Sequence, residues 1–528
     1  MGKILVCDTM ADEGLEILAA AGEVQVRTGL SGSELVSAAQ DATAIVVRSS
    51  THITASVLEA ATACQVVARA GVGVDNIDVP AATRRGILVV NSPAGNILAA
   101  AEHTVALLLA AARQVPQADR STKAGEWERK RFTGKQLEGK TLGLIGLGNV
   151  GRAVARRARA LGMHVVAYDP YVTEERAAED GAELLSLERV LLSAHFVSLH
   201  AVATAESGSL IGPRELSLLR PGAILVNTAR GALVDEKALL SALRDGHLAA
   251  AALDVFAEEP TQNSELVALP NVIATPHVGA LTEEAQVNVA IDVARQVADV
   301  LAGRPPRWPV NAPALPAEAF ETLAPMVPLA RSLGCLGRAL RRGPLRALEV
   351  RCSVGLLAEH LRYLTAVALS ALLEGTTEGP VNVVNARILA DERQVELRET
   401  TLSEDRGYTT SLEFRVAGDE VVTVAGALLD RDRPRVVDLD GYEMDLPPVG
   451  HALLVWRADH GRPGFVGRVG SLLGDAGISI SAIQVSQKPN ADIGLMALSV
   501  QSDIPAEVLQ QIEGERGVVR TCLIDFGG

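Results

Sequence analysis

The stretch GLIGLGNVGRAVA, residues Gly143 to Ala155, decides the fold that the sequence predicts. It carries the spacing G-x-G-x-x-G at Gly146, Gly148 and Gly151, after an apolar run typical of a strand and before a helical pattern. In this context the first glycine permits a tight turn, the second lets a pyrophosphate approach the backbone, and the third lets helix and strand pack closely. The N-terminus of the following helix then holds the phosphates. The stretch therefore predicts a βαβ unit that binds a dinucleotide.

The next strand-like run, HVVAYDP, ends in Asp169. A carboxylate at this place accepts hydrogen bonds from the adenosine ribose, and it repels the 2′-phosphate that distinguishes NADP from NAD. Asp169 therefore favours NAD as the cofactor.

Short apolar runs alternate with helical patterns on both sides of this stretch, which is typical of parallel sheets with right-handed crossovers. The first hundred residues carry four such runs before the glycine motif, so they predict a separate α/β unit. From Lys140 onward six strand-like runs follow, which is the number expected of a dinucleotide-binding sheet. A Pro-rich segment at 304–316 ends this half. The last eighty residues read strand, helix, strand, strand, helix, strand, which is the order of a ferredoxin-like unit.

Composition and charge narrow the class of protein. The 528 residues predict three or four domains, and 48% hydrophobic against 3% aromatic residues fits helices packed on buried sheets. The formal charge of −15 opposes general binding to nucleic acid or to anionic membranes. Five scattered cysteines indicate free thiols, and the sequence shows neither a targeting signal nor an apolar run of about 20 residues. We therefore expect a soluble, cytoplasmic protein without a metal site.

Polar side chains directly follow three later strand-like runs. Arg230 follows AILVNTA, Glu259 follows AALDVF, and His277 follows NVIATP. Because ligands of open parallel sheets sit beyond the carboxyl ends of the strands, these groups can converge on one site. Transfer of a hydride from a secondary alcohol needs a base for the hydroxyl proton, and imidazole suits this near neutral pH. We therefore predict His277 as the base, Glu259 as the carboxylate that orients it and favours its protonated form, and Arg230 as a bidentate clamp for a substrate carboxylate.

The motifs GLGNVG, NTARGALVDEKAL, LDVFAEEP and TPHVGA together resemble the D-2-hydroxyacid dehydrogenase family. The N-terminal RAGVGVDNIDVPAATRRGILVVNSPAGN and the chain length are similar to the long-form 3-phosphoglycerate dehydrogenases of that family. The resemblance implies a flavodoxin-like substrate-binding domain (1–98 and 287–310) into which a Rossmann-type NAD-binding domain (99–286) is inserted. It also implies an α+β intervening regulatory domain (316–447) and a ferredoxin-like ACT domain (450–528), an amino-acid-sensing module.

The resemblance further implies the residues of the sites. The catalytic set of the family matches Arg230, Glu259 and His277. Its NAD contacts match Val72, Gly146, Gly148, Asn149, Val150, Gly151, Asp169, Ala201, Thr228, Ala229, Arg230, Asp254, His277, Val278, Gly279 and Ala280. Its substrate contacts match Arg48, Arg69, Val72, Gly73, Arg230 and His277. Two of these, Arg48 and Arg69, each lie just past a strand-like run, and backbone amides of the GVGVD turn can take an anionic end of the substrate.

The activity that the resemblance implies is NAD-dependent oxidation of 3-phospho-D-glycerate to 3-phosphohydroxypyruvate, the first step of phosphorylated serine biosynthesis. The family also implies a homo-oligomer, a tetramer. Two alternatives stay open: a reductase for another 2-hydroxy or 2-oxo acid such as hydroxypyruvate or 2-oxoglutarate, and a non-catalytic NAD-sensing protein of the same fold. The intact catalytic set disfavours the second. Arg129, Lys130 and Arg131 form a basic cluster that either reaches the active site of a neighbouring subunit or is a solvated face.

The sequence departs from the family pattern at three places. Val202 stands where the family has a proline, which softens a loop near the cofactor without removing a catalytic group. In the C-terminal domain, Gly461 replaces an aspartate that pairs with the ammonium group of an effector, and Ser479 replaces an asparagine that binds its carboxylate. Asp459 and Asp475 are the candidates for compensation. We therefore expect an intact ACT domain in which inhibition by serine is weak or absent.

Overall fold

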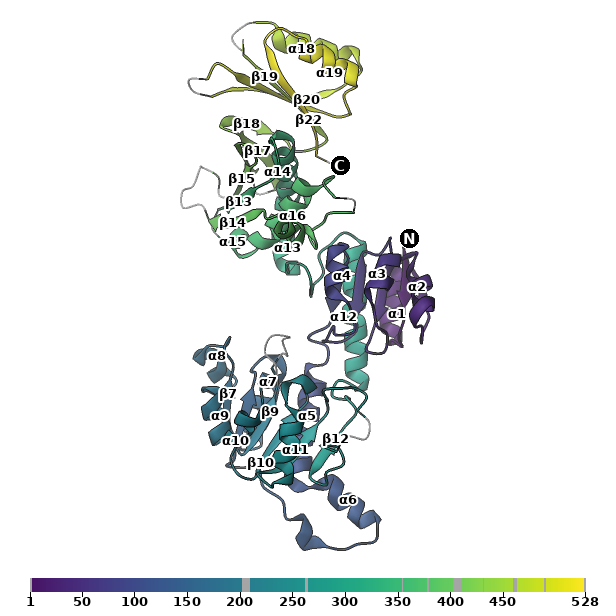
Figure 1. The fold of residues 1–528 in the computed structure, drawn as a ribbon. Coiled ribbons are helices and arrows are strands. Elements are labelled where there is room, and N and C mark those ends of the chain that lie inside the picture. Colours follow the sequence, from purple (N-terminus) through teal and green to yellow (C-terminus); the bar gives the residue numbers. More distant parts are fainter. Residues whose placement is uncertain are drawn as a thin grey trace.

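The computed structural model arranges the chain as four sheets in sequence order, each covered by its own helices (Figure 1). The structure describes residues 2–201, 209–261, 265–353, 355–377, 379–401, 408, 410–430, 432–458, 463–488 and 491–526. Val202, Asp459 and Gly461, named above as departures or as a candidate for compensation, lie outside the described residues.

The first sheet occupies the N-terminal part of the chain. Its elements are β1 (Lys3–Val6), α1 (Asp12–Ala21), β2 (Glu23–Val26), α2 (Gly32–Ala39), β3 (Ala42–Val47), α3 (Ala55–Ala60), β4 (Val66–Arg69), α4 (Val79–Arg84), β5 (Leu88–Asn91) and, much later in the chain, α12 (Glu283–Leu301). All its strands are parallel in the order β2-β1-β3-β4-β5, which is the flavodoxin-like order. Helices α1 and α12 cover one face, and α2, α3 and α4 cover the other. The predicted flavodoxin-like fold is therefore confirmed.

The second sheet holds the glycine motif. Its elements are α5 (Ile97–Arg113), β6 (Thr141–Ile145), α7 (Asn149–Ala160), β7 (His164–Tyr168), α8 (Glu174–Glu179), β8 (Glu183–Leu184), α9 (Leu187–Ser193), β9 (Phe196–Leu199), α10 (Pro213–Leu218), β10 (Ala223–Asn227), η2 (Gly231–Leu233), α11 (Glu236–Arg244), β11 (Leu248–Leu253) and β12 (Val272–Ala274). The parallel order β12-β11-β10-β9-β6-β7-β8 is that of a Rossmann sheet with a further strand at one edge. The prediction of six strands was wrong by one, because β8 has only two residues and leaves no apolar run in the sequence.

The chain crosses between these two sheets twice, once before α5 and once before α12. The crossings pack together at Gly95, where an added Cβ would lie 2.7 Å from Cγ1 of Val289 on α12. After α12 the chain returns to the first sheet, where Asn311 bonds to the backbone of β5 and the residue before it. Its Oδ1 accepts from the Val89 amide at 2.8 Å, and its Nδ2 donates to the Ile87 carbonyl at 2.9 Å. The first unit is thus completed by a segment that lies far from it in the sequence.

An exposed arm follows α5 and contains α6 (Val115–Lys123) and the short η1 (Arg129–Phe132). Figure 1 shows α6 projecting beyond the helices of the second sheet. Trp127 on this arm is 79% exposed. The predicted basic cluster lies on η1, and the structure exposes all three of its members, Arg129, Lys130 and Arg131.

The third sheet is mixed rather than parallel. Its elements are α13 (Ala317–Leu323), α14 (Met326–Leu340), β13 (Ala347–Cys352), α15 (Leu356–Glu359), α16 (Leu361–Leu373), α17 (Ala386–Glu392), β14 (Glu396–Thr401), β15 (Ser411–Ala417), β16 (Val421–Leu429), β17 (Arg433–Leu439) and β18 (Tyr442–Leu446). In the order β14-β13-β15-β16-β17-β18, only the pair β13 and β14 is parallel. Helices α14 and α16 pack on one face of this sheet, which is the predicted α+β arrangement.

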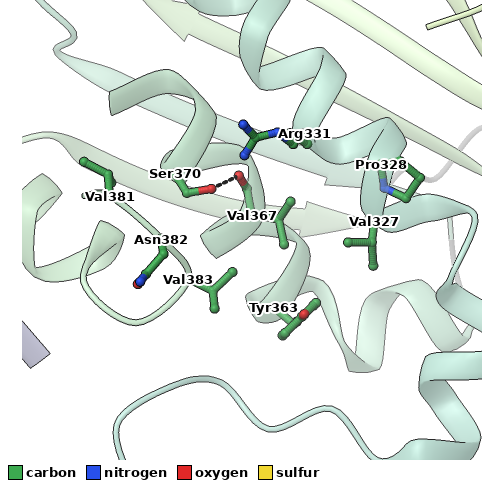
Figure 2. A pocket seen from close by; sticks show the side chains of 9 residues that line it. All are labelled: Val327, Pro328, Arg331, Tyr363, Val367, Ser370, Val381, Asn382 and Val383. Carbon is green, nitrogen blue, oxygen red and sulfur yellow. Dashed lines mark hydrogen bonds between the residues drawn. The ribbon is translucent and has the colours of Figure 1, made fainter. Parts of the chain in front are cut away.

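The third unit joins the first through the segment 381–385. A pocket of about 410 Å³ opens between α14, α16 and this segment, with Val327, Val367 and Val383 among its apolar walls (Figure 2). From the same segment, Asn382 donates through Nδ2 to the Gly86 carbonyl of the first unit at 2.8 Å. This joint holds the third unit to the first sheet.

The fourth sheet has the predicted βαββαβ order. Its elements are β19 (His451–Arg457), α18 (Phe465–Asp475), β20 (Ile480–Gln487), β21 (Gly494–Val500), α19 (Ala506–Glu513) and β22 (Val518–Asp525). The strands are antiparallel in the order β20-β21-β19-β22, and α18 and α19 cover one face. The other face, with Leu454, Leu495 and Ile524, belongs to the same core as the third sheet. The third and fourth sheets therefore share one hydrophobic core.

Within the part of the chain that the structure describes, no helix has the length and apolarity that crossing a membrane requires. The cysteines are free thiols, and burial raises the pKa of both Cys7 and Cys64 to about 12. Because the thiolate is the reactive form, these two side chains act as core residues rather than as nucleophiles.

We expect Asn311→Ala to loosen the first sheet. The change leaves the Val89 amide and the Ile87 carbonyl without their partner, and each buried polar group left unpaired costs about 1 to 3 kcal/mol. The measurement is hydrogen exchange across residues 85–91, which should become faster by at least tenfold. Gln25→Ala is the control, since it removes one side-chain bond to Glu23 on the edge strand of the same sheet. Unchanged exchange in Asn311→Ala would show that the returning segment does not stabilise this sheet.

Candidate active site

The glycine loop leaves open space in front of a helix N-terminus. Gly146 has φ of +96°, and an added Cβ would lie 2.6 Å from backbone atoms of His200 and Ala201. At Gly151 an added Cβ would collide with the carbonyl oxygen of Gly146. At Gly148, the residue that caps α7, an added Cβ would meet no atom within 4 Å. The loop is thus tight on the protein side and open at Gly148, a shape that fits a pyrophosphate at the helix N-terminus.

Asp169 follows β7 beside this loop. Its Oδ2 accepts from the Leu147 amide at 2.8 Å, and its Oδ1 accepts from the Tyr171 amide at 2.9 Å. A carboxylate oxygen accepts about two hydrogen bonds, so each oxygen keeps an acceptor position. The side chain is therefore fixed by the backbone and still able to accept from ribose hydroxyls.

His277 and Glu259 form a hydrogen-bonded pair. The Nδ1 atom of His277 lies 2.7 Å from Oε2 of Glu259, while Oε1 of Glu259 accepts from the Phe256 amide at 2.9 Å. Because the carboxylate only accepts, Nδ1 carries the proton and Nε2 is left as the proton acceptor toward a substrate. His277 also has φ of +54°, a left-handed conformation that an L-residue adopts only where its surroundings hold it.

Asp254 stabilises the left-handed backbone of His277 through bonds to the residues around it. It is 1% exposed, and its Oδ1 accepts from the Thr275 hydroxyl at 2.6 Å and from the Val278 amide at 2.9 Å, while Oδ2 accepts from the Gly279 amide at 2.8 Å. Burial alone would raise the pKa of Asp254, but its donors, with His103 first among them, keep that pKa below the ordinary value. One buried carboxylate thus fixes both sides of the turn that carries the imidazole.

Two side chains of α5 complete this edge, and no motif predicted them. His103 Nε2 lies 3.3 Å from Oδ1 of Asp254 and 3.2 Å from Oγ1 of Thr275. Thr104 Oγ1 lies 2.7 Å from Oγ1 of Thr228. The one sequence signal for them is a polar pair inside the apolar helix AAAEHTVALLLAAA. Helix α5 therefore ties together the ends of β10, β11 and β12.

Three arginines gather from the two units. The Arg230 guanidinium lies against the Gly73 turn, where an added Cβ would collide with Nη2, and its Nε is 3.4 Å from Oδ2 of Asp75. Burial, and after it the positive charge of Arg230, lowers the pKa of the Arg69 guanidinium, and Arg48 adds to the effect. The Nε of Arg69 is buried and has no hydrogen-bond partner among the described residues. Such a cluster of like charges fits an anionic ligand that is bound between the units.

The remaining predicted site residues lie as follows. Val72 is partly exposed in the turn beside Gly73, and its carbonyl accepts from Asn91 Nδ2 at 2.5 Å. The residues at the carboxyl edge of the second sheet and at the start of α7 are Asn149, Val150, Ala201, Ala229 and Ala280. Two sets lie elsewhere: Arg129 to Arg131 are on the exposed arm, and Ser479 is exposed just before β20.

Three family models match successive parts of the chain. Residues 105–279 match the NAD binding domain of D-isomer specific 2-hydroxyacid dehydrogenases, residues 322–440 match the D-3-phosphoglycerate dehydrogenase intervening domain, and residues 453–517 match the ACT domain. Full-length relatives named D-3-phosphoglycerate dehydrogenase include one from a Synechocystis species, 42% identical over 98% of this chain and 94% of its own. Another, from Bacillus subtilis, is 36% identical over 100% of both chains. The chain belongs to the D-3-phosphoglycerate dehydrogenase family.

Solved structures resemble the first two units of this chain, which are the first and second sheets with their helices. A protein from Thermus thermophilus is 39% identical with a TM-score of 0.55, covering 58% of this chain and 99% of its own. A glyoxylate reductase from Paecilomyes thermophila is 30% identical with a TM-score of 0.55, and the match covers 58% of this chain and 98% of the reductase chain. NAD is the cofactor of the matched domain, and the open space at Gly148 together with the acceptor Asp169 fits it.

We expect Gly148→Val to separate cofactor binding from folding. The Cβ of the valine would meet no protein atom within 4 Å at the helix N-terminus, so the melting temperature should change by less than about 2 °C. The dissociation constant for NADH, measured by fluorescence, should rise at least tenfold. Gly146→Ala is the contrast, because its Cβ would clash with His200 and Ala201 at a positive φ and lower the melting temperature itself. Unchanged NADH affinity in Gly148→Val would rule out this loop as the pyrophosphate site.

Proposed function

We propose that the protein catalyses the NAD-dependent oxidation of 3-phospho-D-glycerate to 3-phosphohydroxypyruvate, the first step of phosphorylated serine biosynthesis. The observation that carries the proposal is the hydrogen-bonded His277–Glu259 pair at the carboxyl edge of the sheet that bears the glycine loop. A cluster of Arg48, Arg69 and Arg230 supports it. Relatives with 36% to 42% identity over nearly the whole chain bear the name of that activity.

We assign a role to each proton and charge of this reaction. NAD, when bound, supplies the hydride acceptor. His277 takes the proton of the substrate hydroxyl at Nε2, because its Nδ1–H is already donated to Glu259. The carboxylate 2.7 Å away stabilises the imidazolium that results. Arg230 holds the substrate carboxylate next to the reacting carbon and polarises the carbonyl in the reverse direction.

The charge of the arginine cluster favours a phosphorylated acid. Arg48, Arg69 and Arg230 bring three positive charges. The carboxylates of Asp75 and Asp8 lie beside them, so the cluster keeps a positive excess for an anionic group such as a phosphate. We assign the phosphate to Arg48 and Arg69, and the carboxylate to Arg230. A short unphosphorylated acid such as hydroxypyruvate would leave the buried Arg69 Nε without an anion. A non-catalytic NAD sensor would have no use for the His277–Glu259 pair.

We expect His277→Ala to lower kcat for 3-phosphoglycerate oxidation by about 10²- to 10⁴-fold, the usual contribution of a general base. NADH formation at 340 nm is the measurement, with NADH affinity as the check that the cofactor site is intact. The control is His164→Ala, which changes an exposed imidazole at the start of β7. Near wild-type turnover in His277→Ala would contradict the assignment of His277 as the base.

For the wild-type protein, kcat/KM should fall by at least 10²-fold from 3-phosphoglycerate to D-glycerate. Equal kcat/KM for 3-phosphoglycerate and D-glycerate would contradict the assignment of a phosphorylated substrate.

We also propose how the regulatory half behaves. The ACT match indicates a small-molecule binding module, and we assign it a weak or absent response to serine in a cytoplasmic homo-tetramer. Ser479 is exposed before β20 and offers one hydroxyl where an asparagine would offer two N–H donors. Gly461 carries no charge to pair with an ammonium group, although its place is outside the described residues.

We expect serine to inhibit reduction of phosphohydroxypyruvate only at millimolar concentration or not at all. Loss of a charge-assisted pair costs about 2 to 5 kcal/mol, or roughly 30- to 4000-fold in affinity. The double change Gly461→Asp with Ser479→Asn should shift the inhibition curve to at least tenfold lower serine. Inhibition of the unchanged protein at micromolar serine would contradict the proposal.

A further inference from the structure

The pocket between α14, α16 and the segment 381–385 lies in the third unit, outside the two sheets that carry the candidate active site (Figure 2). Its volume is about 410 Å³. Small-molecule sites in proteins range from roughly 300 to 1000 Å³, so the pocket is large enough for a ligand. None of the residues that line it takes part in the proposed reaction.

The walls of the pocket are mainly apolar. Val327 and Val367 line it from α14 and α16, and Val381 and Val383 line it from the joining segment. Val367 is 6% exposed, whereas Val327 and Val383 are partly exposed to solvent. Burial raises the pKa of Tyr363, which lies one helical turn before Val367, so this wall is uncharged near neutral pH. An apolar group bound between these walls would remove their exposed surface from water.

One end of the pocket is polar, where Figure 2 shows Arg331 beside Ser370. Ser370 Oγ donates to the Val367 carbonyl at 2.7 Å, so its hydrogen is already engaged. Asn382 is engaged as well, because its Nδ2 donates to Gly86 and its Oδ1 accepts from the Val384 amide. The Arg331 side chain is 44% exposed, and it is the charged donor of the pocket.

Arg331 shares its carboxylate partner with a second arginine. Nη2 of Arg331 lies 3.4 Å from Oε1 of Glu374, and Nη1 of Arg338 lies 3.0 Å from Oε2 of the same side chain. Two guanidinium groups and one carboxylate leave an excess of positive charge at the polar end. The Arg331 contact is also the longer and therefore the weaker of the two. An incoming anion can thus bind Arg331 while Glu374 keeps Arg338.

We propose that this pocket binds a small monocarboxylate with an apolar tail. The carboxylate lies on the Arg331 guanidinium, whose N–H groups match its two oxygens, and the tail lies between Val327, Val367 and Val383. Among the described lining residues no second cation faces the apolar end, and an unpaired charge there would be costly. Acids with a second charge, 3-phosphoglycerate among them, are therefore disfavoured. The site is separate from the proposed reaction, and the inference does not rest on that reaction.

The test uses octanoate as the probe and octanamide, which has the same tail without the charge, as its comparison. Titration calorimetry on the full-length protein should give octanoate a dissociation constant below about 1 mM and octanamide one about tenfold higher. We expect Arg331→Gln to weaken octanoate at least about tenfold and to leave octanamide within about twofold, since only octanoate uses the charge. Arg346→Gln is the matched control, because it removes an exposed arginine of the same unit that pairs with Asp419.

A second variant tests the apolar end. Val327→Phe places a larger side chain in the pocket at a partly exposed position, so it should weaken both ligands at least about fivefold. The melting temperature of each variant, measured beside the titrations, shows that the protein is folded.

Four outcomes would overturn the inference. The first is no binding of octanoate up to about 10 mM, and the second is equal affinity for octanoate and octanamide. The third is octanoate affinity that is unchanged in Arg331→Gln or in Val327→Phe. The fourth is equal weakening in Arg331→Gln and Arg346→Gln, which would show an effect of overall charge. None of these results depends on turnover of 3-phosphoglycerate, whose absence in the wild-type protein would contradict only the proposed function.

Discussion

The buried carboxylate of Asp254 is the interaction on which the site depends. A charge with 1% exposure is costly unless donors surround it, and this one is met by the Thr275 hydroxyl, two backbone amides and His103. Because both amides belong to the turn after β12, satisfying the charge also fixes that turn. The left-handed backbone of His277 is thereby held in place, and its imidazole is directed toward Glu259. The turn after β12 and the His277 imidazole are thus positioned by the same buried group.

The second constraint is that the charged side chains proposed for the site come from both α/β units. Arg48 follows β3 and Arg69 ends β4 of the first sheet, whereas Arg230 and His277 follow strands of the second. The units meet at the two crossings, which can pack as closely as they do because Gly95 has no side chain to displace α12. Closure of one unit on the other would exclude water from the reacting atoms. The third unit is attached through Asn382 to the first sheet, which carries Arg48 and Arg69.

Much of the fold and part of the site could be predicted because they follow from local or periodic requirements. The glycine loop needs a positive φ at Gly146 and no side chain at Gly151, and both demands are visible in the spacing of the motif. The contact of Glu259 with His277 follows from parallel strands that end at one edge, and Arg230 follows a third strand of the same sheet. The strand β8 escaped prediction because two residues carry no pattern. His103 escaped because its role depends on α5 packing over the ends of β11 and β12, which are about 150 residues away in the chain.

The sequence by itself predicted the strands that carry clear apolar runs, the α/β class of the first two units and the βαββαβ order of the last one, since these depend on residue pattern and short-range geometry. In β19 the apolar run ALLVW indicates burial on both faces, yet it does not name the partner of either face. Only the tertiary structure decided that one face of this strand shares a core with the third sheet, that three arginines from two units become neighbours, and that α5 supplies His103 to Asp254. Contacts of this kind join residues far apart in sequence, and they arise only when whole elements pack.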